Sequence, residues 1–222
     1  MKIACLSGWG QPADALSSIA PEAAHVAYAA HADLAQALTH IAEAAQDAEL
    51  VIGWSMGGQM AVRAVAAGYI APRRLVLIGT PFQFVRNEKL ALGMGPDTHA
   101  QFRHNLVYQP TRAFGKSYAL IAHGDHKADA VQSFLRPAPA HDWLYWLDAM
   151  ADYSCAGLDF SAFPPTLLIH GERDAVTGAE QCKAFHAALP RATLAILEGC
   201  GHAPHWHDPA RVQHLITAHV QR

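Results

Sequence analysis

The residue with the clearest chemical potential in this sequence is Ser55, at the centre of Gly53-Trp54-Ser55-Met56-Gly57. The apolar run Leu50–Ile52 precedes this segment, and a helical pattern follows it. A G-x-S-x-G segment between a strand and a helix places its serine on a sharp, strained turn, with the hydroxyl exposed above the sheet edge. The helix N-terminus favours negative charge that develops there. The pattern predicts a nucleophile, and the alternative is a glycine-rich helix start with a capping serine.

A nucleophilic serine needs a base, and the base needs an orienting acid. In folds with this turn, the acid and then the histidine follow the serine along the chain. Asp174 comes shortly after the apolar run Thr166–His170, and His202 comes shortly after Thr193–Leu197. The three residues are therefore expected at one edge of a parallel sheet, with His202 as general base and Asp174 as its orienting acid. Alternatives are a capping role for Asp174, a surface-loop role for His202, and Glu172 as the acid.

An oxyanion formed at Ser55 would need backbone N–H donors aimed at it. One is expected from Met56, the residue after the nucleophile. The other is expected from Trp9, in the loop Leu6-Ser7-Gly8-Trp9-Gly10 that follows an early apolar run. The glycines give this loop conformational freedom. The alternative is an ordinary turn with a packed tryptophan.

Two histidine-rich clusters resemble metal ligands: His202-x-x-His205-x-His207 with Asp208, and His123-x-Asp125-His126. Neither has a known ligand spacing, and a single loop rarely supplies a complete site. We therefore expect no metal and no other cofactor. His205 and His207 are expected at a pocket rim or in the approach to the last helix. Cys200 does not lie on a sharp strand-to-helix turn like that of Ser55, so it is not expected to act as a nucleophile.

Apolar runs alternate with helical patterns, which predicts an α/β fold with a mainly parallel sheet of about six strands. The predicted strands are Lys2–Leu6, His25–Tyr28, Leu50–Gly53, Arg74–Gly79, Thr166–His170 and Thr193–Leu197. The predicted helices between and after them are Asp33–Gln46, with Asp33 as cap, Gly57–Ala67, Ala179–Leu189 and Pro209–Val220. Most of the strands are apolar throughout, as expected when helices cover both faces of a sheet.

The alternation is interrupted between residues 85 and 165, where no strand is evident. Helical patterns cover His99–Tyr108, Arg112–His123 and Trp143–Met150, and prolines divide this stretch from the next strand. We predict a core formed by residues 1–84 and 166–222, with residues 85–165 inserted as a helical lid. Trp143, Tyr145 and Trp146 are expected in the lid core.

Composition excludes several classes of protein. The 222 residues are 51% hydrophobic and 16% charged, with a formal net charge of −3. A nucleic-acid-binding protein would show a basic stripe and a high pI. No stretch approaches the roughly 20 apolar residues of a membrane span, and no secretory leader is evident. We therefore expect a cytoplasmic protein, with its four scattered cysteines reduced.

The residues above resemble the α/β-hydrolase family along most of the chain. The likeness runs through Leu6–Gly10, Gly53–Gly58, Thr80-Pro81-Phe82, Gly171–Asp174, Gly201–Pro204 and Asp208-Pro209. Trp9, Trp54 and the segment Phe84–Leu106 are most similar to the esterases of biotin synthesis that cleave the methyl ester of a pimeloyl chain on acyl-carrier protein. Ser7 stands where such proteins usually have histidine. The usual first hairpin is missing before Lys2, and a Gly-x-Gly-x-Ser loop is missing between Tyr28 and Asp33.

This resemblance implies a serine carboxylic-ester hydrolase that works through an acyl-enzyme on a small acyl ester. It implies Ser55, Asp174 and His202 as the triad, with Trp54 beside the substrate. Arg103, Arg112 and Lys116 on the lid would contact acyl-carrier protein, or would be solvated helix faces. The alternatives are a small-ester or lactone hydrolase of another pathway and a non-catalytic binding protein of the same fold.

Overall fold

The computed structural model describes residues 1–222 and contains one six-stranded sheet in the order β2-β1-β3-β4-β5-β6. All five strand pairs are parallel. The strands are β1 (Ile3–Leu6), β2 (Ala24–Val26), β3 (Leu50–Trp54), β4 (Arg74–Ile78), β5 (Thr166–Gly171) and β6 (Ala192–Leu197). The predicted α/β fold with a parallel sheet is confirmed. The second predicted strand is shorter than expected, because Tyr28 begins the 3-10 helix η2 (Tyr28–Ala30).

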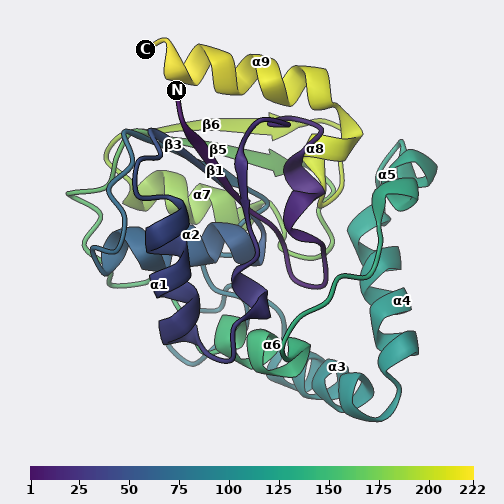
Figure 1. Ribbon diagram of the computed structural model, residues 1–222. Helices are drawn as coiled ribbons and strands as arrows, with labels where there is room; N and C mark the ends of the chain where they lie inside the picture. Colours follow the sequence, from purple (N-terminus) through teal and green to yellow (C-terminus); the bar gives the residue numbers. More distant parts are fainter.

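Helices cover both faces of the sheet (Figure 1). One face carries α1 (Leu34–Ala44), α2 (Met56–Ala66) and α7 (Glu180–Ala188), while the other carries α9 (Pro209–Val220), the short α8 (Pro204–His207) and the 3-10 helix η1 (Ala13–Leu16). The strands supply alternate side chains to two apolar clusters. Val51 packs with the first set of helices and Ile52 with the second. Because successive strand residues point to opposite faces, continuous apolar runs became the buried strands.

Aspartate side chains cap the N-termini of two helices that the sequence predicts. The Asp33 side chain accepts a hydrogen bond from the Gln36 N–H at the start of α1, as expected for a cap. Asp208 caps α9 in the same way through the Arg211 N–H, with Pro209 in the first turn. The short helix α8 was not predicted, because a single turn leaves no helical repeat in the sequence.

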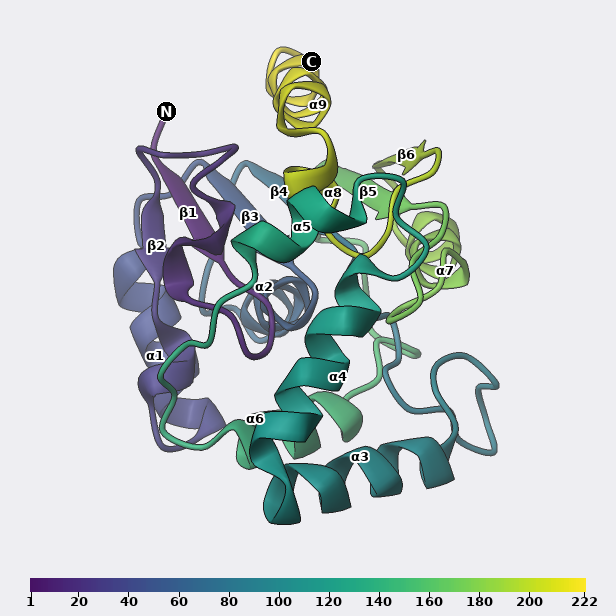
Figure 2. The ribbon, with the colours of Figure 1, turned by 90° about the vertical axis from the view of Figure 1, so that its right-hand side faces the viewer.

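Residues 85–165 lie between β4 and β5 and are called the insertion below. It contains α3 (Pro96–Tyr108), α4 (Pro110–Ala122), α5 (Ala128–Phe134) and α6 (Trp143–Ala151). The arrowheads of β5 and β6 point toward α4 and α5 in Figure 1, and Figure 2 shows all four helices on that side of the molecule. Trp146 is fully buried in the first cluster, and Trp143 and Tyr145 pack against it. No helix is long and apolar enough to cross a bilayer, and the four cysteines are buried and unpaired.

Candidate active site

Ser55 lies between β3 and α2 in a conformation that side chains rarely adopt. Its φ is 54° and its ψ is −121°, and it is the only non-glycine residue with positive φ. Such backbone conformations cost of order 1–3 kcal/mol and persist only where the surroundings hold them. The Ser55 N–H donates to the Ile78 carbonyl at 2.8 Å, which ties the turn to the neighbouring strand.

The glycines around Ser55 are required by close packing. A Cβ at Gly57 would lie 2.1 Å from the Leu6 carbonyl oxygen, and one at Gly58 would lie 1.9 Å from Thr80 Oγ1. At Gly53 it would lie 2.5 Å from the Gly58 Cα. The turn is therefore wedged against the loops after β1 and β4, which explains the glycine pattern seen in the sequence.

Asp174 and His202 meet across the loops that follow β5 and β6. His202 Nδ1 lies 2.8 Å from Asp174 Oδ2, with both side chains almost completely buried. The other carboxylate oxygen accepts the backbone N–H groups of Val176 and Thr177, each at 2.8 Å. Burial would raise the pKa of Asp174, but the charge of His202 and hydrogen bonds from His170 and His202 hold it well below its usual value. Asp174 is therefore an ionised, fixed acceptor for the His202 ring.

Ser55 and His202 line the same cavity, of about 150 Å³. The structure records no hydrogen bond between their side chains, and in enzymes without substrate such contacts are often long. The cavity is mainly apolar and extends under the insertion, where Phe84, Phe102 and Met150 form part of its wall. It has the composition of a small-ligand pocket, although it is smaller than the usual 300–1,000 Å³.

Trp9 lines this cavity, and Met56 directly follows Ser55, which also lines it. The backbone N–H of Trp9 donates to no backbone carbonyl. Met56 is the first residue of α2, where backbone N–H groups have no partner within the helix. The insertion fixes the Trp9 side chain: the indole N–H donates to the Trp143 carbonyl at 2.9 Å, and the ring stacks on Phe114. Both backbone N–H groups are therefore free of backbone acceptors, as donors to an oxyanion would have to be.

The rival assignments occupy other positions. Glu172 accepts a hydrogen bond from the Gly199 N–H and lies beside Arg173, so its carboxylate does not share the position of Asp174 next to His202. His205 was expected at a rim or in the approach to the last helix. It lies on α8, just before α9, and is fully buried against Trp54, so the rim alternative is wrong. Burial lowers the pKa of His205 to about 3, with a further contribution from the charge of His202.

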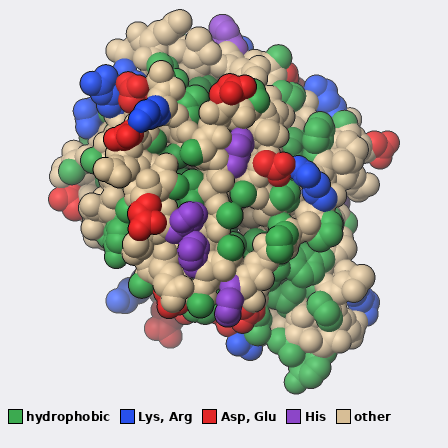
Figure 3. All heavy atoms as spheres, viewed as in Figure 1, with side chains coloured by type: hydrophobic (Ala, Val, Ile, Leu, Met, Phe, Trp, Pro, Cys, Tyr) green, Lys and Arg blue, Asp and Glu red, His purple; other side chains and the backbone are tan.

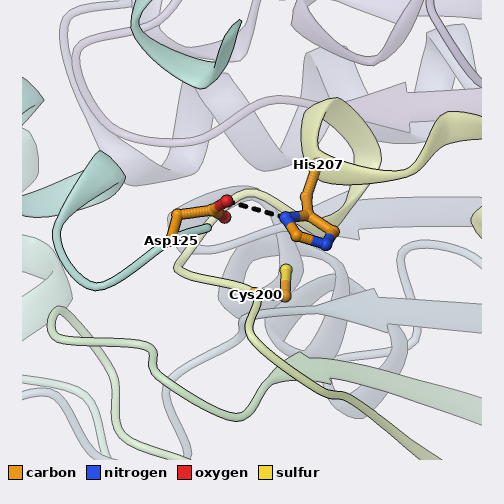
Figure 4. A group of neighbouring side chains, drawn as sticks. All are labelled: Asp125, Cys200 and His207. Atoms are coloured by element: carbon orange, nitrogen blue, oxygen red, sulfur yellow. Dashed lines mark hydrogen bonds and ion pairs between the residues drawn. The ribbon is translucent and has the colours of Figure 1, made fainter. Parts of the chain in front are cut away.

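One group of side chains has the composition of a metal site: Asp125, Cys200 and His207, shown in Figure 4. The group joins members of both histidine-rich clusters. However, Asp125 is already occupied as an acceptor. It receives the Gly201 N–H, the Lys127 N–H and His207 Nδ1, each at 2.7 Å. Burial raises the pKa of the Cys200 thiol, which disfavours the thiolate that a metal requires. The geometry is better explained as a hydrogen-bonded link between the insertion and the loop carrying His202.

The remaining candidate residues have different surroundings. The Trp54 indole N–H donates to the His202 carbonyl at 3.0 Å, and its ring lines the cavity. Lys116 on α4 also lines the cavity. Arg103 forms an exposed ion pair with Asp148 at 2.9 Å, whereas exposed Arg112 donates a hydrogen bond to the Gln109 side chain.

The fold agrees with that of the proteins to which this chain is similar. Residues 5–214 match the model of the family described as "Alpha/beta hydrolase family". The chain belongs to the alpha/beta hydrolase family. An esterase from Exiguobacterium antarcticum superposes on this alpha/beta hydrolase with a TM-score of 0.83 and 17% identity, covering 100% of this chain and 92% of the other.

Two curated relatives of this alpha/beta hydrolase are named pimeloyl-[acyl-carrier protein] methyl ester esterase. The protein from Nitrosomonas europaea is 31% identical over 167 residues, covering 69% of this chain and 64% of its own length. The protein from Aromatoleum aromaticum is 31% identical over 182 residues, covering 77% of this chain and 73% of its own length. The chain thus spans less than two thirds of the Nitrosomonas protein.

Two residues near the site of this hydrolase were not singled out from the sequence. His170 ends an apolar run and resembles an ordinary strand residue, and Thr177 carries no motif. Both contact Asp174 in the structure. Asp125 was weighed only as a metal ligand. Its proximity to Gly201 is a contact across 76 positions of the chain, which no local pattern reveals.

Proposed function

We propose that this protein is a serine carboxylic-ester hydrolase in which Ser55 is the nucleophile, His202 the general base and Asp174 its orienting acid. The observation that carries the proposal is the convergence of three independent loops. The strained Ser55 turn, the 2.8 Å His202–Asp174 contact and the Trp9 loop all border one cavity. The strain, the burial of the carboxylate and the free N–H groups each cost stability, and a nucleophilic site accounts for all of them.

In the proposed reaction, His202 removes the proton from the Ser55 hydroxyl as its oxygen attacks the ester carbonyl. The N–H groups of Trp9 and Met56 stabilise the resulting oxyanion. His202 then returns the proton to the departing alkoxide, which leaves as an alcohol and yields an acyl-enzyme on Ser55. Water, deprotonated by His202, hydrolyses the acyl-enzyme to a carboxylic acid and restores Ser55.

We further propose, from the names of the two curated relatives, that the ester is the methyl ester of an acyl chain carried on acyl-carrier protein. The insertion would then serve as a lid that meets the carrier. Hydrophobic side chains gather on the molecular surface over α3 and α4, at the lower right of Figure 3, and include the exposed Val107 and Tyr108. Arg112 and Lys116 supply positive charge on α4, whereas Arg103 is neutralised by Asp148. Methanol would be the alcohol released.

The cavity volume supports a second candidate, the hydrolysis of small free esters. A cavity of about 150 Å³ is filled by a short acyl group, and a longer chain would need the insertion to shift. On this hypothesis the hydrolase would act on esters outside biotin synthesis, and the carrier-protein surface would have no role.

Both candidates are tested with p-nitrophenyl esters from acetate to octanoate, using wild type and Ser55→Ala in parallel. Turnover that disappears in Ser55→Ala supports the hydrolase, and its chain-length profile measures the pocket. Pimeloyl methyl ester, free and on carrier protein, then separates the candidates: a strong preference for the carrier-bound ester supports the first. Equal hydrolysis by Ser55→Ala, or failure of a fluorophosphonate to label Ser55 in folded wild type, would contradict the proposed chemistry.

A further inference from the structure

A second cavity adjoins the loop that carries Trp9. Its volume is about 430 Å³, larger than the cavity of about 150 Å³ at Ser55 and within the usual range for small-ligand sites. Gly8 lines both cavities, while Trp9 lines the first and Trp143 the second. The two indole rings are in edge-to-face contact. The cavities are therefore neighbours, and a ligand chain that passes Gly8 contacts both.

The segment 135–142, between α5 and α6, forms one wall of the second cavity. It runs past the loops that follow β1 and β2, as Figure 2 shows. It is fastened at both ends: Arg136 contacts Asp14 at 2.9 Å, and the His141 N–H donates to the Ala29 carbonyl at 3.0 Å. Residues between these two contacts line the cavity. Contacts within the protein therefore hold this wall in place.

Two buried polar side chains line the second cavity without a hydrogen-bond partner in the protein. Ser7 and Gln11 are each 3% exposed, and Ser7 Oγ, Gln11 Oε1 and Gln11 Nε2 all lack a partner. Tyr118 of α4 lies beside Gln11, but its hydroxyl donates to the Gly10 carbonyl at 3.3 Å. Buried polar groups are rarely left unpaired, so these atoms indicate a ligand that supplies the matching donors and acceptors.

The lining determines which chemistry fits the second cavity. No Lys, Arg, Asp or Glu lines it, and its walls are mainly alanine, proline and valine. A charged ligand would therefore lose its hydration without gaining an opposite charge. The Gln11 carboxamide has one accepting oxygen and one donating nitrogen, and the Ser7 hydroxyl can donate or accept. A secondary amide supplies the complementary N–H and C=O groups, and aliphatic chain on either side of it matches the apolar walls.

We propose that the second cavity is a subsite for a secondary amide in the substrate, held by Gln11 and Ser7 while the ester carbonyl lies at Ser55. This inference rests on the proposed hydrolase function. The amide belongs either to the acyl chain of a free ester or to the amide-containing arm that links an acyl chain to a carrier protein. Both sources present the same group in an otherwise aliphatic chain, and the test separates them.

The test uses pairs of substrates that have equal numbers of chain atoms and differ in one amide. For free esters, the p-nitrophenyl esters of acetamidobutanoate, acetamidohexanoate and acetamidooctanoate are paired with those of heptanoate, nonanoate and undecanoate. For the carrier arm, the thioesters of monomethyl pimelate with N-acetylcysteamine and with pentanethiol are compared by methanol release. Within each pair, the amide-to-alkyl ratio of kcat/KM cancels any general loss of activity in a variant.

We expect this ratio to be about tenfold higher in wild type than in Gln11→Leu for the pairs whose amide reaches Gln11, because two hydrogen bonds are lost in the variant. Leucine fills a similar volume without a donor or an acceptor. Ser7→Ala, which removes one hydrogen-bonding group, should lower the ratio by a smaller factor. Gln132→Leu, at an exposed glutamine of α5, is the matched control and should keep the wild-type ratio.

A change confined to the p-nitrophenyl esters assigns the amide to the acyl chain, and one confined to the thioesters assigns it to the carrier arm. Equal ratios in wild type and folded Gln11→Leu for every pair would overturn the proposal and leave Gln11 and Ser7 satisfied by water only. If no ester is turned over, the hydrolase proposal fails, and N-butylbutanamide then decides the site. A shift of the Gln11 side-chain ¹⁵N–¹H signals supports it, whereas unchanged signals at the highest soluble amide concentration overturn it.

Discussion

Replacing Asp125 with alanine tests whether the insertion holds the proposed base in place. The Asp125 carboxylate is fully buried and accepts hydrogen bonds from Gly201, Lys127 and His207, each at 2.7 Å. Gly201 directly precedes His202. Two further backbone hydrogen bonds join the same segments: His202 N–H to the Ile121 carbonyl and His126 N–H to the Gly199 carbonyl.

The expected cost follows from the groups that lose their acceptor. A buried N–H without a partner costs about 1–3 kcal/mol, and Gly201 N–H is such a group. His207 and Lys127 are closer to solvent and can bond to water, so we expect a total loss of about 3 kcal/mol. For a chain of this size, that lowers Tm by about 6–12 °C. A shift of about 1 Å in a catalytic group can cost about 100-fold in rate, so kcat should fall by up to that factor with little change in KM.

The assay combines thermal unfolding followed by circular dichroism with kcat and KM for p-nitrophenyl acetate, measured well below the Tm of the variant. Asp129→Ala is the matched control, because Asp129 is an exposed acid four residues away on α5. It should change neither quantity appreciably. If Asp125→Ala loses stability but retains wild-type kcat, the link supports the fold without positioning His202, and the reasoning is refuted.

Three other outcomes are expected. The raised pKa of His170, about 10, contributes stability that is complete below its unfolded pKa of about 6.5 and is lost as the pH rises through 10. Urea unfolding should therefore show wild type losing more stability between these pH values than His170→Gln, which keeps only the loss from the buried thiols; parallel losses would contradict this. Gly57→Ala should prevent soluble expression, since its Cβ would meet the β1 carbonyl at 2.1 Å. Gly115→Ala, with open space on α4, should raise stability by about 0.5–1 kcal/mol, and equal effects would refute the packing argument. Phe102→Ala should enlarge the cavity and move the p-nitrophenyl ester preference toward longer chains, and an unchanged profile would remove Phe102 from the acyl wall.

Much of the fold follows from the sequence because its signals are local. Apolar runs such as Leu50–Ile52 can be buried on both faces only in a covered parallel sheet, and Asp33 and Pro209 mark helix starts through their own chemistry. The turn at Ser55 is an equally local signal. Its glycines can be recognised in the sequence because a sharp strand-to-helix turn needs them within five residues. The order of Asp174 and His202 after successive strands then places both at the same sheet edge.

The tertiary structure decided what lies beyond those local signals. That Asp174 contacts two histidines depends on the loop after β5 folding back over its own strand, and a buried His170 in an apolar run carries no mark of this. Asp125 reaches Gly201 only because α4 and α5 pack beside the loop after β6. Cavity size likewise depends on how closely the insertion approaches Ser55. Contacts between distant segments are set by packing of the whole chain, so residue type and local spacing predict which groups reach the site edge but not all that they touch there.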